Sequence, residues 1–166
     1  AGLNAAHPFP DDRATIVDLF AAQTGMILSF VCQLLEERLH PDLYDRVRRE
    51  VERRVLTPFM TCNDEWWMGY TRKDLNNWTP WIISNILIAA SIQWTDSLHF
   101  SQLAERACRM LDTWLAVVPQ DGGCDEGPSY WRVAGGALYN ACLVLYDMSD
   151  GYINIFRDPL VVNIAE

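Results

Sequence analysis

The chain has 166 residues, of which 50% are hydrophobic, and this is enough for one domain with a hydrophobic core. Its 13 basic and 22 acidic side chains give a formal net charge of -9, which disfavours binding to nucleic acids and to anionic membrane surfaces. No apolar run reaches the length of a membrane span, because the longest, residues 81–92, is interrupted by Ser84, Asn85 and Ser91. We therefore predict a single domain with neither a nucleic-acid nor a membrane partner.

The five cysteines show no CxxC or Cys/His spacing, which argues against a disulfide framework and against a zinc site. We expect no metal and no cofactor, and interpret the cysteines as small core residues. The sequence does not begin with a basic region, an apolar stretch and a cleavage site, so no signal peptide is expected in it. The histidines His7, His40 and His99 fall at the terminus or at expected helix boundaries, which favours capping or solvent-exposed roles.

Two helices are predicted in the first part of the chain. Residues 13–40 carry apolar side chains at helical spacing on one face, including Phe20, Ile27 and Leu34, and the opposite face is also mostly apolar. Residues 41–62 open with Pro41 in a favourable first-turn position and carry one apolar stripe opposite several arginines. We expect the first helix to be buried and the second to have one face in water.

Three further helices are predicted, and they alternate in the same way. The third begins at Thr79, as a cap, and Pro80, and its residues are apolar almost all round to position 90. Residues 97–118 carry one apolar stripe that includes Leu103, Met110 and Trp114, whereas residues 129–148 return to the buried type with small side chains. An inner, outer, inner, outer, inner order is typical of helical hairpins arranged in two rings, so we predict an all-α fold that forms an incomplete α/α toroid; an ordinary helical bundle is the alternative.

Two long connections, residues 60–78 and 118–129, break the pattern of short loops, and both lead into an inner helix. If the inner helices run parallel, the two loops lie at the same end of the fold, beside two helix N-termini. The positive ends of the helix dipoles would favour an anionic ligand there.

The first loop is rich in aromatic and polar side chains, within the sequence MTCNDEWWMGYTRKDLNNWTPW. Aromatic rings stack on the C–H faces of sugars, and amides and guanidinium groups bind hydroxyls and carboxylates. We therefore predict a carbohydrate ligand, although each tryptophan alone could instead brace the loop against the core. The candidate binding residues here are Trp66, Trp67, Tyr70, Arg72, Asn76, Trp78 and Trp81.

The second loop reads DGGCDEGPSYW, in which three glycines and a proline impose a tight path. It holds Asp125, Glu126, Tyr130 and Trp131 at the start of the fifth helix. The acidic pair has three interpretations: charge partners of the helix N-terminus, acceptors for sugar hydroxyls, or the acid and base of a hydrolase.

The motifs NNWTPW (76–81) and DGGCDEGPSYW (121–131) resemble those of the heparinase II/III-type polysaccharide lyases. The similarity covers the second helix through the fifth, and the second motif is the more specific. The resemblance implies an N-terminal α/α toroid followed by a β-sandwich domain, with the active site between them, in a secreted or periplasmic enzyme. The chain then represents one part of the toroid, whose partners are the remainder of that domain, the β-sandwich and an acidic polysaccharide.

The resemblance also implies β-elimination, in which the C5 proton of a uronic acid is removed and the bond to O4 breaks. Asn77 matches the family's residue that neutralises the substrate carboxylate, with Asn76 as the alternative, and Tyr130 matches the tyrosine that acts as base, acid or both. A phenol has a pKa of about 10, so Tyr130 needs a neighbour such as Arg132 or Arg72. The chain departs from the family at Trp78, where many relatives have histidine, and the family's further catalytic histidine would lie beyond Glu166.

Two other classes of function stay open. A toroidal glycoside hydrolase would use Asp125 or Glu126, and Asp74, as opposed carboxyl groups. A non-catalytic carbohydrate-binding module would keep the tryptophans and tolerate Tyr130→Phe.

Overall fold

The computed structural model describes residues 16–94 and 97–165, and every regular element within these ranges is a helix. The α-helices are α1 (Leu19–Leu34), α2 (Pro41–Val51), α3 (Thr57–Thr61), α4 (Trp78–Gln93), α5 (Ser97–Leu115), α6 (Pro128–Met148) and α7 (Pro159–Ala165). Short turns of other helix types are η1 (Glu52–Leu56), η2 (Trp66–Met68) and η3 (Ile155–Arg157). The all-α prediction is confirmed, and no described helix is long and apolar enough to cross a membrane.

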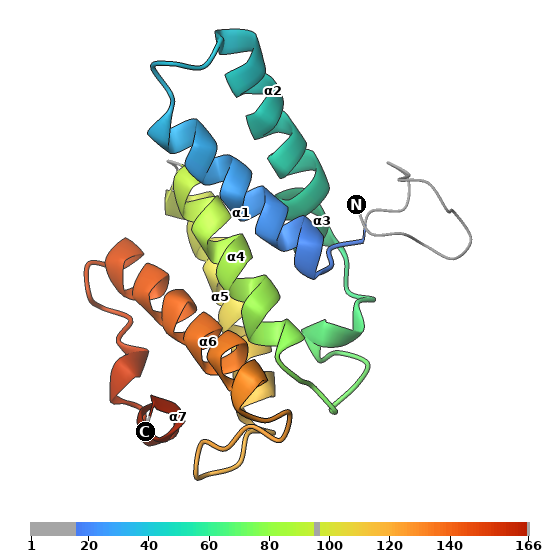
Figure 1. Ribbon diagram of the computed structural model, residues 1–166, viewed down its shortest axis with the longest axis vertical. Helices are drawn as coiled ribbons and strands as arrows, with labels where there is room; N and C mark the ends of the chain where they lie inside the picture. Colours follow the sequence, from blue (N-terminus) through green and yellow to red (C-terminus); the bar gives the residue numbers. More distant parts are fainter. Residues whose placement is uncertain (1–15, 95–96, 166) are drawn as a thin grey trace.

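Helix α4 is the centre of the fold. α1 packs along one side of it and α6 along the other, and α5 packs against it behind them (Figure 1). Side chains such as Ile82, Ile86 and Leu87 have no exposed surface. The prediction of a buried third helix is confirmed, and the physical reason is that a helix that is apolar all round is stable in water only when other elements surround it.

Helices α1, α4 and α6 run in the same direction (Figure 1). A hydrogen bond ties α4 to α1, because the Gln93 amide donates to Ser29 Oγ at 3.1 Å. The Trp67 indole N–H of η2 donates to the carbonyl of Val17, just before α1, at 3.0 Å. The Thr79 hydroxyl in turn donates to the Trp67 carbonyl at 2.7 Å. The long loops that precede α4 and α6 therefore reach the same end of the molecule, as the sequence predicted.

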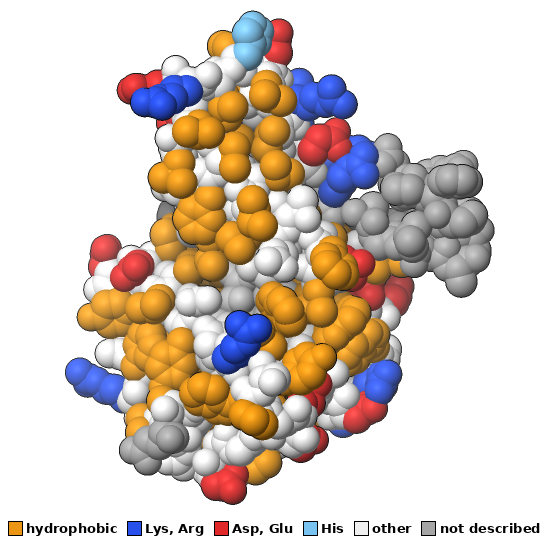
Figure 2. Space-filling model, in the orientation of Figure 1, with side chains coloured by type: hydrophobic (Ala, Val, Ile, Leu, Met, Phe, Trp, Pro, Cys, Tyr) orange, Lys and Arg blue, Asp and Glu red, His pale blue; other side chains and the backbone are white. Residues whose placement is uncertain are grey.

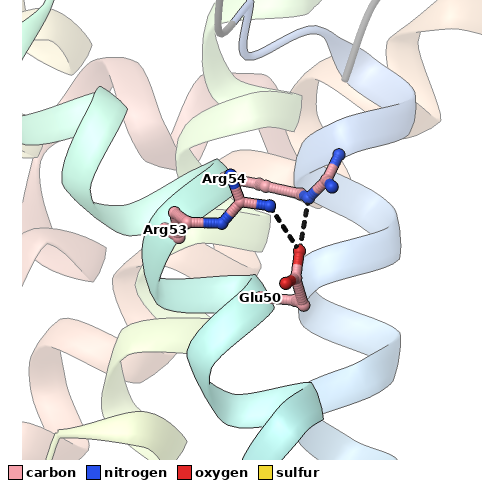
Figure 3. Close-up of polar contacts among 3 residues, drawn as sticks. All are labelled: Glu50, Arg53 and Arg54. Atoms are coloured by element: carbon pink, nitrogen blue, oxygen red, sulfur yellow. Dashed lines mark hydrogen bonds and ion pairs between the residues drawn. The ribbon is translucent and has the colours of Figure 1, made fainter. Parts of the chain in front are cut away.

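Residues 41–61 form one continuous helical stretch, because α2 passes through the π-helical turn η1 into α3. Pro58 has no backbone N–H to donate in the α-helical pattern, and the π-helical turn η1 ends two residues before it, at Leu56. Beside this turn the Glu50 carboxylate accepts hydrogen bonds from Arg54 and from Arg53, the latter at 2.9 Å (Figure 3). The bonds from Arg54 and Arg53 lower the pKa of Glu50, so the group stays ionised on the exposed face of the helix.

The burial predicted for the first helix is only half correct. α1 buries one face against α4 and α2, but Phe20, Ile27 and Leu34 are 79%, 48% and 77% exposed. They lie seven residues apart and form a single apolar stripe, and Figure 2 shows hydrophobic side chains gathered along α1. Within the described residues no element covers this stripe, which is the physical reason for the correction.

Candidate functional site

The first long loop is held in place by Trp67. Its ring has no exposed surface, stacks on Phe59 with a centroid distance of 6.4 Å, and donates its N–H to Val17. The prediction that Trp67 contacts a substrate is corrected, because a ligand cannot reach a ring with no exposed surface. Trp67 braces the loop, which is the alternative that the sequence left open for each tryptophan.

Arg106 is a second anchor of this loop, and the sequence analysis did not single it out. Its Nε donates to the Phe59 carbonyl at 2.8 Å, and its guanidinium group also binds Asn63 Oδ1 at 2.8 Å. The same group lies over the ring of Tyr70, 5.6 Å from the centroid. The helical pattern placed Arg106 opposite the apolar stripe of α5, and no sequence signal indicated that residues 43 and 47 positions earlier would bind it.

The other aromatic residues of the loop lie nearer the surface. Trp66 and Trp78 are half-buried and contact each other at a centroid distance of 5.2 Å. Arg72 lies 5.1 Å over the Trp66 ring and donates to Asp74 Oδ1 at 2.8 Å. This hydrogen bond lowers the pKa of Asp74 to about 2, so Asp74 is ionised and Arg72 is already paired.

The second long loop is positioned by its glycines. Gly122 has φ +75°, and a Cβ there would lie 2.4 Å from the carbonyl carbon of Asn163 in α7. The Asn163 amide also donates to the Gln120 carbonyl at 2.7 Å, so α7 is packed directly on this loop. Gly127, with φ +86°, is the N-cap of α6. The tight path predicted for this motif is therefore used to dock it against the C-terminal helix.

Asn77 and Glu126 join the two loops. Glu126 Oε2 accepts from the Asn77 backbone N–H at 3.0 Å, and both carboxylate oxygens lie 2.8 Å from Asn77 Nδ2. Asn77 is the N-cap of α4, so the carboxylate also lies at the positive end of that helix. The predicted cap, Thr79, is wrong: the cap is two residues earlier, at Asn77, and the Thr79 hydroxyl bonds to the Trp67 carbonyl instead.

The side chain of Asn77 keeps unused hydrogen-bonding capacity. It is 3% exposed, and its Oδ1 has no partner among the described residues. Nδ2 donates to both oxygens of the Glu126 carboxylate, so Oδ1 is the atom of this amide that is left without a partner. Glu126 thus fixes the orientation of the amide without satisfying it.

Tyr130 occupies the first turn of α6, at the same end of the molecule as Asn77, and is 49% exposed. Its hydroxyl makes no hydrogen bond within the described residues, so neither Arg132 nor Arg72 contacts it there. Trp131 is 38% exposed beside it and Arg132 is also exposed. On α4, Trp81 is half-buried, and the side-chain Oδ1 of Asn76 accepts from the Trp78 backbone N–H at 3.0 Å.

A pocket of about 380 Å³ lies between the two loops, the end of α5 and α7. It includes the candidate residues Asn76, Asn77, Asp125, Glu126 and Trp131. The walls are completed by Lys73, Asp74, Leu75, Trp114, Val117, Val118, Pro119, Gly122, Gly123, Cys124, Ala134, Gly135 and Ile164. The structure therefore brings the two motifs together around one cavity, with Tyr130 outside its lining.

Within residues 16–94 and 97–165, no group of three His, Cys, Asp or Glu side chains is placed to hold a metal ion, and all five cysteines are free. Burial, followed by the neighbouring Cys108, raises the pKa of Cys142 to about 11, so the group stays a neutral thiol at neutral pH. Comparison with known proteins adds no family: no family model and no curated protein matches the chain.

Proposed function

We propose that this chain forms part of the α/α toroid of a polysaccharide lyase that cleaves a uronic-acid-containing polysaccharide by β-elimination. The observation that carries the proposal is the set of hydrogen bonds between Asn77 and Glu126. They join the two motifs that resemble the heparinase II/III-type lyases, although 49 residues separate them in the chain. The exposed phenol of Tyr130 at the same end of the molecule supports the proposal further.

In the proposed reaction the Asn77 amide N–H binds the uronate carboxylate and withdraws charge from it. This stabilises the enolate-like intermediate that forms when Tyr130, as phenolate, takes the proton from C5. The cation that the phenolate needs is proposed to come from the remainder of the toroid, because neither Arg72 nor Arg132 hydrogen-bonds to Tyr130 in the described residues. The electron pair left on C5 forms the C4–C5 double bond as the C4–O4 bond breaks. The leaving O4 receives a proton from the tyrosine, so the phenolate is regenerated.

The exposed apolar stripe of α1 supports the toroid as the architecture. Phe20, Ile27 and Leu34 lie at one-heptad intervals along the edge of the layer formed by α1, α4 and α6. A further helix packed on this edge would bury them and extend the layer. The remainder of the toroid and a β-sandwich domain are thus proposed partners.

The test is a screen of this chain, and of a longer protein that contains it, against a panel of acidic polysaccharides. Elimination produces an unsaturated sugar that absorbs at about 232 nm, as expected for a C4–C5 double bond conjugated to a carboxylate, and we expect Tyr130→Phe to lower the rate by about 10²-fold or more. Asn77→Ala should lower it similarly, with circular dichroism as the check on folding. Tyr152→Phe is the matched control, because Tyr152 is 92% exposed beyond the end of α6. Near-normal turnover in both site variants contradicts the proposal.

A glycoside hydrolase is the second candidate, because Asp74, Asp125 and Glu126 line the same pocket. Hydrolysis needs two opposed carboxyl groups, one as acid and one as base or nucleophile. It would release reducing ends without the ultraviolet absorbance, and it would be abolished by Asp125→Asn or Glu126→Gln rather than by Tyr130→Phe.

A further inference from the structure

The hydrogen-bond donors of Asn77 are already occupied by a carboxylate of the chain itself. The Asn77 backbone N–H donates to Glu126 Oε2 at 3.0 Å, and Asn77 Nδ2 lies 2.8 Å from each oxygen of the same carboxylate. The proposed reaction needs this amide for the carboxylate of the substrate. Glu126 therefore makes the contact that a uronate would have to make.

This arrangement does not admit a second carboxylate at Asn77. The residue is 3% exposed, so a ligand does not reach its amide while Glu126 is bound to it. Two carboxylates on one amide would also repel each other, and water screens this repulsion poorly at a buried position. A uronate can use Asn77 only after Glu126 has left it.

Of these two residues, Glu126 is the one that can move. Asn77 is the N-cap of α4, the helix at the centre of the fold. Glu126 is half-buried in the second loop, directly before Gly127, where an added Cβ would meet nothing within 4 Å. Within the described residues Glu126 makes no ion pair with Lys or Arg, so its bonds to Asn77 and the dipole of α4 hold it in place.

We propose that Glu126 is an internal competitor of the substrate: its carboxylate occupies the Asn77 amide in the unliganded protein and leaves it when a uronate binds. The inference rests on the proposed lyase function and adds a regulation of the same site. Both residues line the pocket between the two loops, so a ligand that enters the pocket meets this pair. Binding of a uronate then exchanges one carboxylate for another, which a sugar without a carboxylate does not do.

The experiment is a nuclear magnetic resonance titration of the full chain with methyl glucuronide, and with methyl glucoside as its uncharged counterpart. Glu126→Gln removes the charge but keeps an oxygen that can accept from Asn77. Hydrogen bonds to neutral acceptors are weaker than those to carboxylates, so we expect this variant to bind the glucuronide at least about tenfold more tightly than the parent and to show shifts of the Asn77 signals. The affinity for the glucoside should change by less than about twofold.

Glu126→Ala separates competition from positioning. If the carboxylate only held Asn77 in place for the substrate, its removal would weaken glucuronide binding, whereas a competing carboxylate predicts tighter binding. Circular dichroism checks the fold, and Glu126→Gln decides alone if the alanine variant does not fold. Weaker or unchanged glucuronide binding in either folded variant overturns the inference, and so does the absence of glucuronide binding in the parent and both variants.

Asp125→Asn is the matched control. Asp125 is an exposed carboxylate of the same pocket, and within the described part of the chain it does not bond to Asn77. Its substitution should raise the affinity for the glucuronide clearly less than Glu126→Gln does. Equal gains would mean that the charge of the pocket, and not the occupied amide, weakens glucuronide binding, and would overturn the inference.

The outcome is separable from that of the lyase proposal. If the Glu126 variants bind the glucuronide more tightly but no polysaccharide is eliminated, the competition stands and the lyase proposal fails. If elimination occurs while neither variant gains affinity for the glucuronide, the lyase proposal stands and the competition fails.

Discussion

The two long loops lead into neighbouring parallel helices, yet they are anchored by opposite means. The first is held by bulky groups: Trp67 is inserted into the core and Arg106 binds the backbone from α5. The second is held by the lack of a side chain, because Gly122 lets the backbone of α7 approach where a Cβ would lie 2.4 Å from it. One loop is held by side chains that fill space and the other by the absence of a side chain, and the pocket is lined by residues of both loops.

This difference teaches that similar loop length and position do not imply similar tolerance to change. In the first loop, removing an anchoring side chain should lower the free energy of unfolding. In the second loop, adding a side chain should lower it. Two substitutions test the contrast, and a third tests the ionisation of Glu65 in the first loop; they follow from the largest expected effect to the smallest.

Trp67→Ala should have the largest effect. The substitution leaves a cavity next to Phe59 and removes the hydrogen bond to Val17, which predicts a loss of about 3–5 kcal/mol of unfolding free energy. Urea denaturation followed by circular dichroism measures it. The matched control is Trp131→Ala, since Trp131 is 38% exposed and should cost clearly less. Equal losses would mean that Trp67 is not the anchor of the first loop.

Gly122→Ala should be next. A left-handed backbone costs a residue with a Cβ about 1–2 kcal/mol, and the overlap with Asn163 adds to this, so we expect a loss of about 3 kcal/mol. Gly136→Ala is the control, because a Cβ at Gly136 in α6 meets nothing within 4 Å and should stabilise the helix by up to about 1 kcal/mol. A neutral Gly122→Ala variant would contradict the close packing of α7 on the second loop.

Glu65→Gln should have the smallest effect, and it depends on pH. Burial, followed by the charge of Asp18, raises the pKa of Glu65 above its ordinary value of 4.5. Between the pKa of Glu65 in the unfolded chain and its raised pKa in the folded protein, the folded protein binds more protons. The free energy of unfolding therefore falls as the pH rises through this interval. We expect the variant to melt at a higher temperature than the parent near neutral pH, and the difference to vanish below pH 4.5. A difference that is constant across this range would remove Glu65 ionisation as the cause.

Much of the architecture could be predicted from periodicity. The apolar stripe of α5, with Leu103, Met110 and Trp114, is buried as expected, and α4 is enclosed as a helix without a polar face must be. The glycine motif also predicted a tight loop before α6. These features are local, because they depend on which residues repeat within one helix or one turn.

The tertiary structure alone decided which apolar and polar groups find partners. In it the apolar stripe of α1 is exposed, Trp67 is buried whereas its neighbour Trp66 is half-buried, and the Asn77 amide donates to Glu126. Spacing along a helix marks a face as apolar but does not say what covers it, and no pattern within either motif encodes a contact across 49 residues. The all-helical fold was therefore set by local sequence, whereas the pocket exists only because packing brings the two loops to the same end of parallel helices.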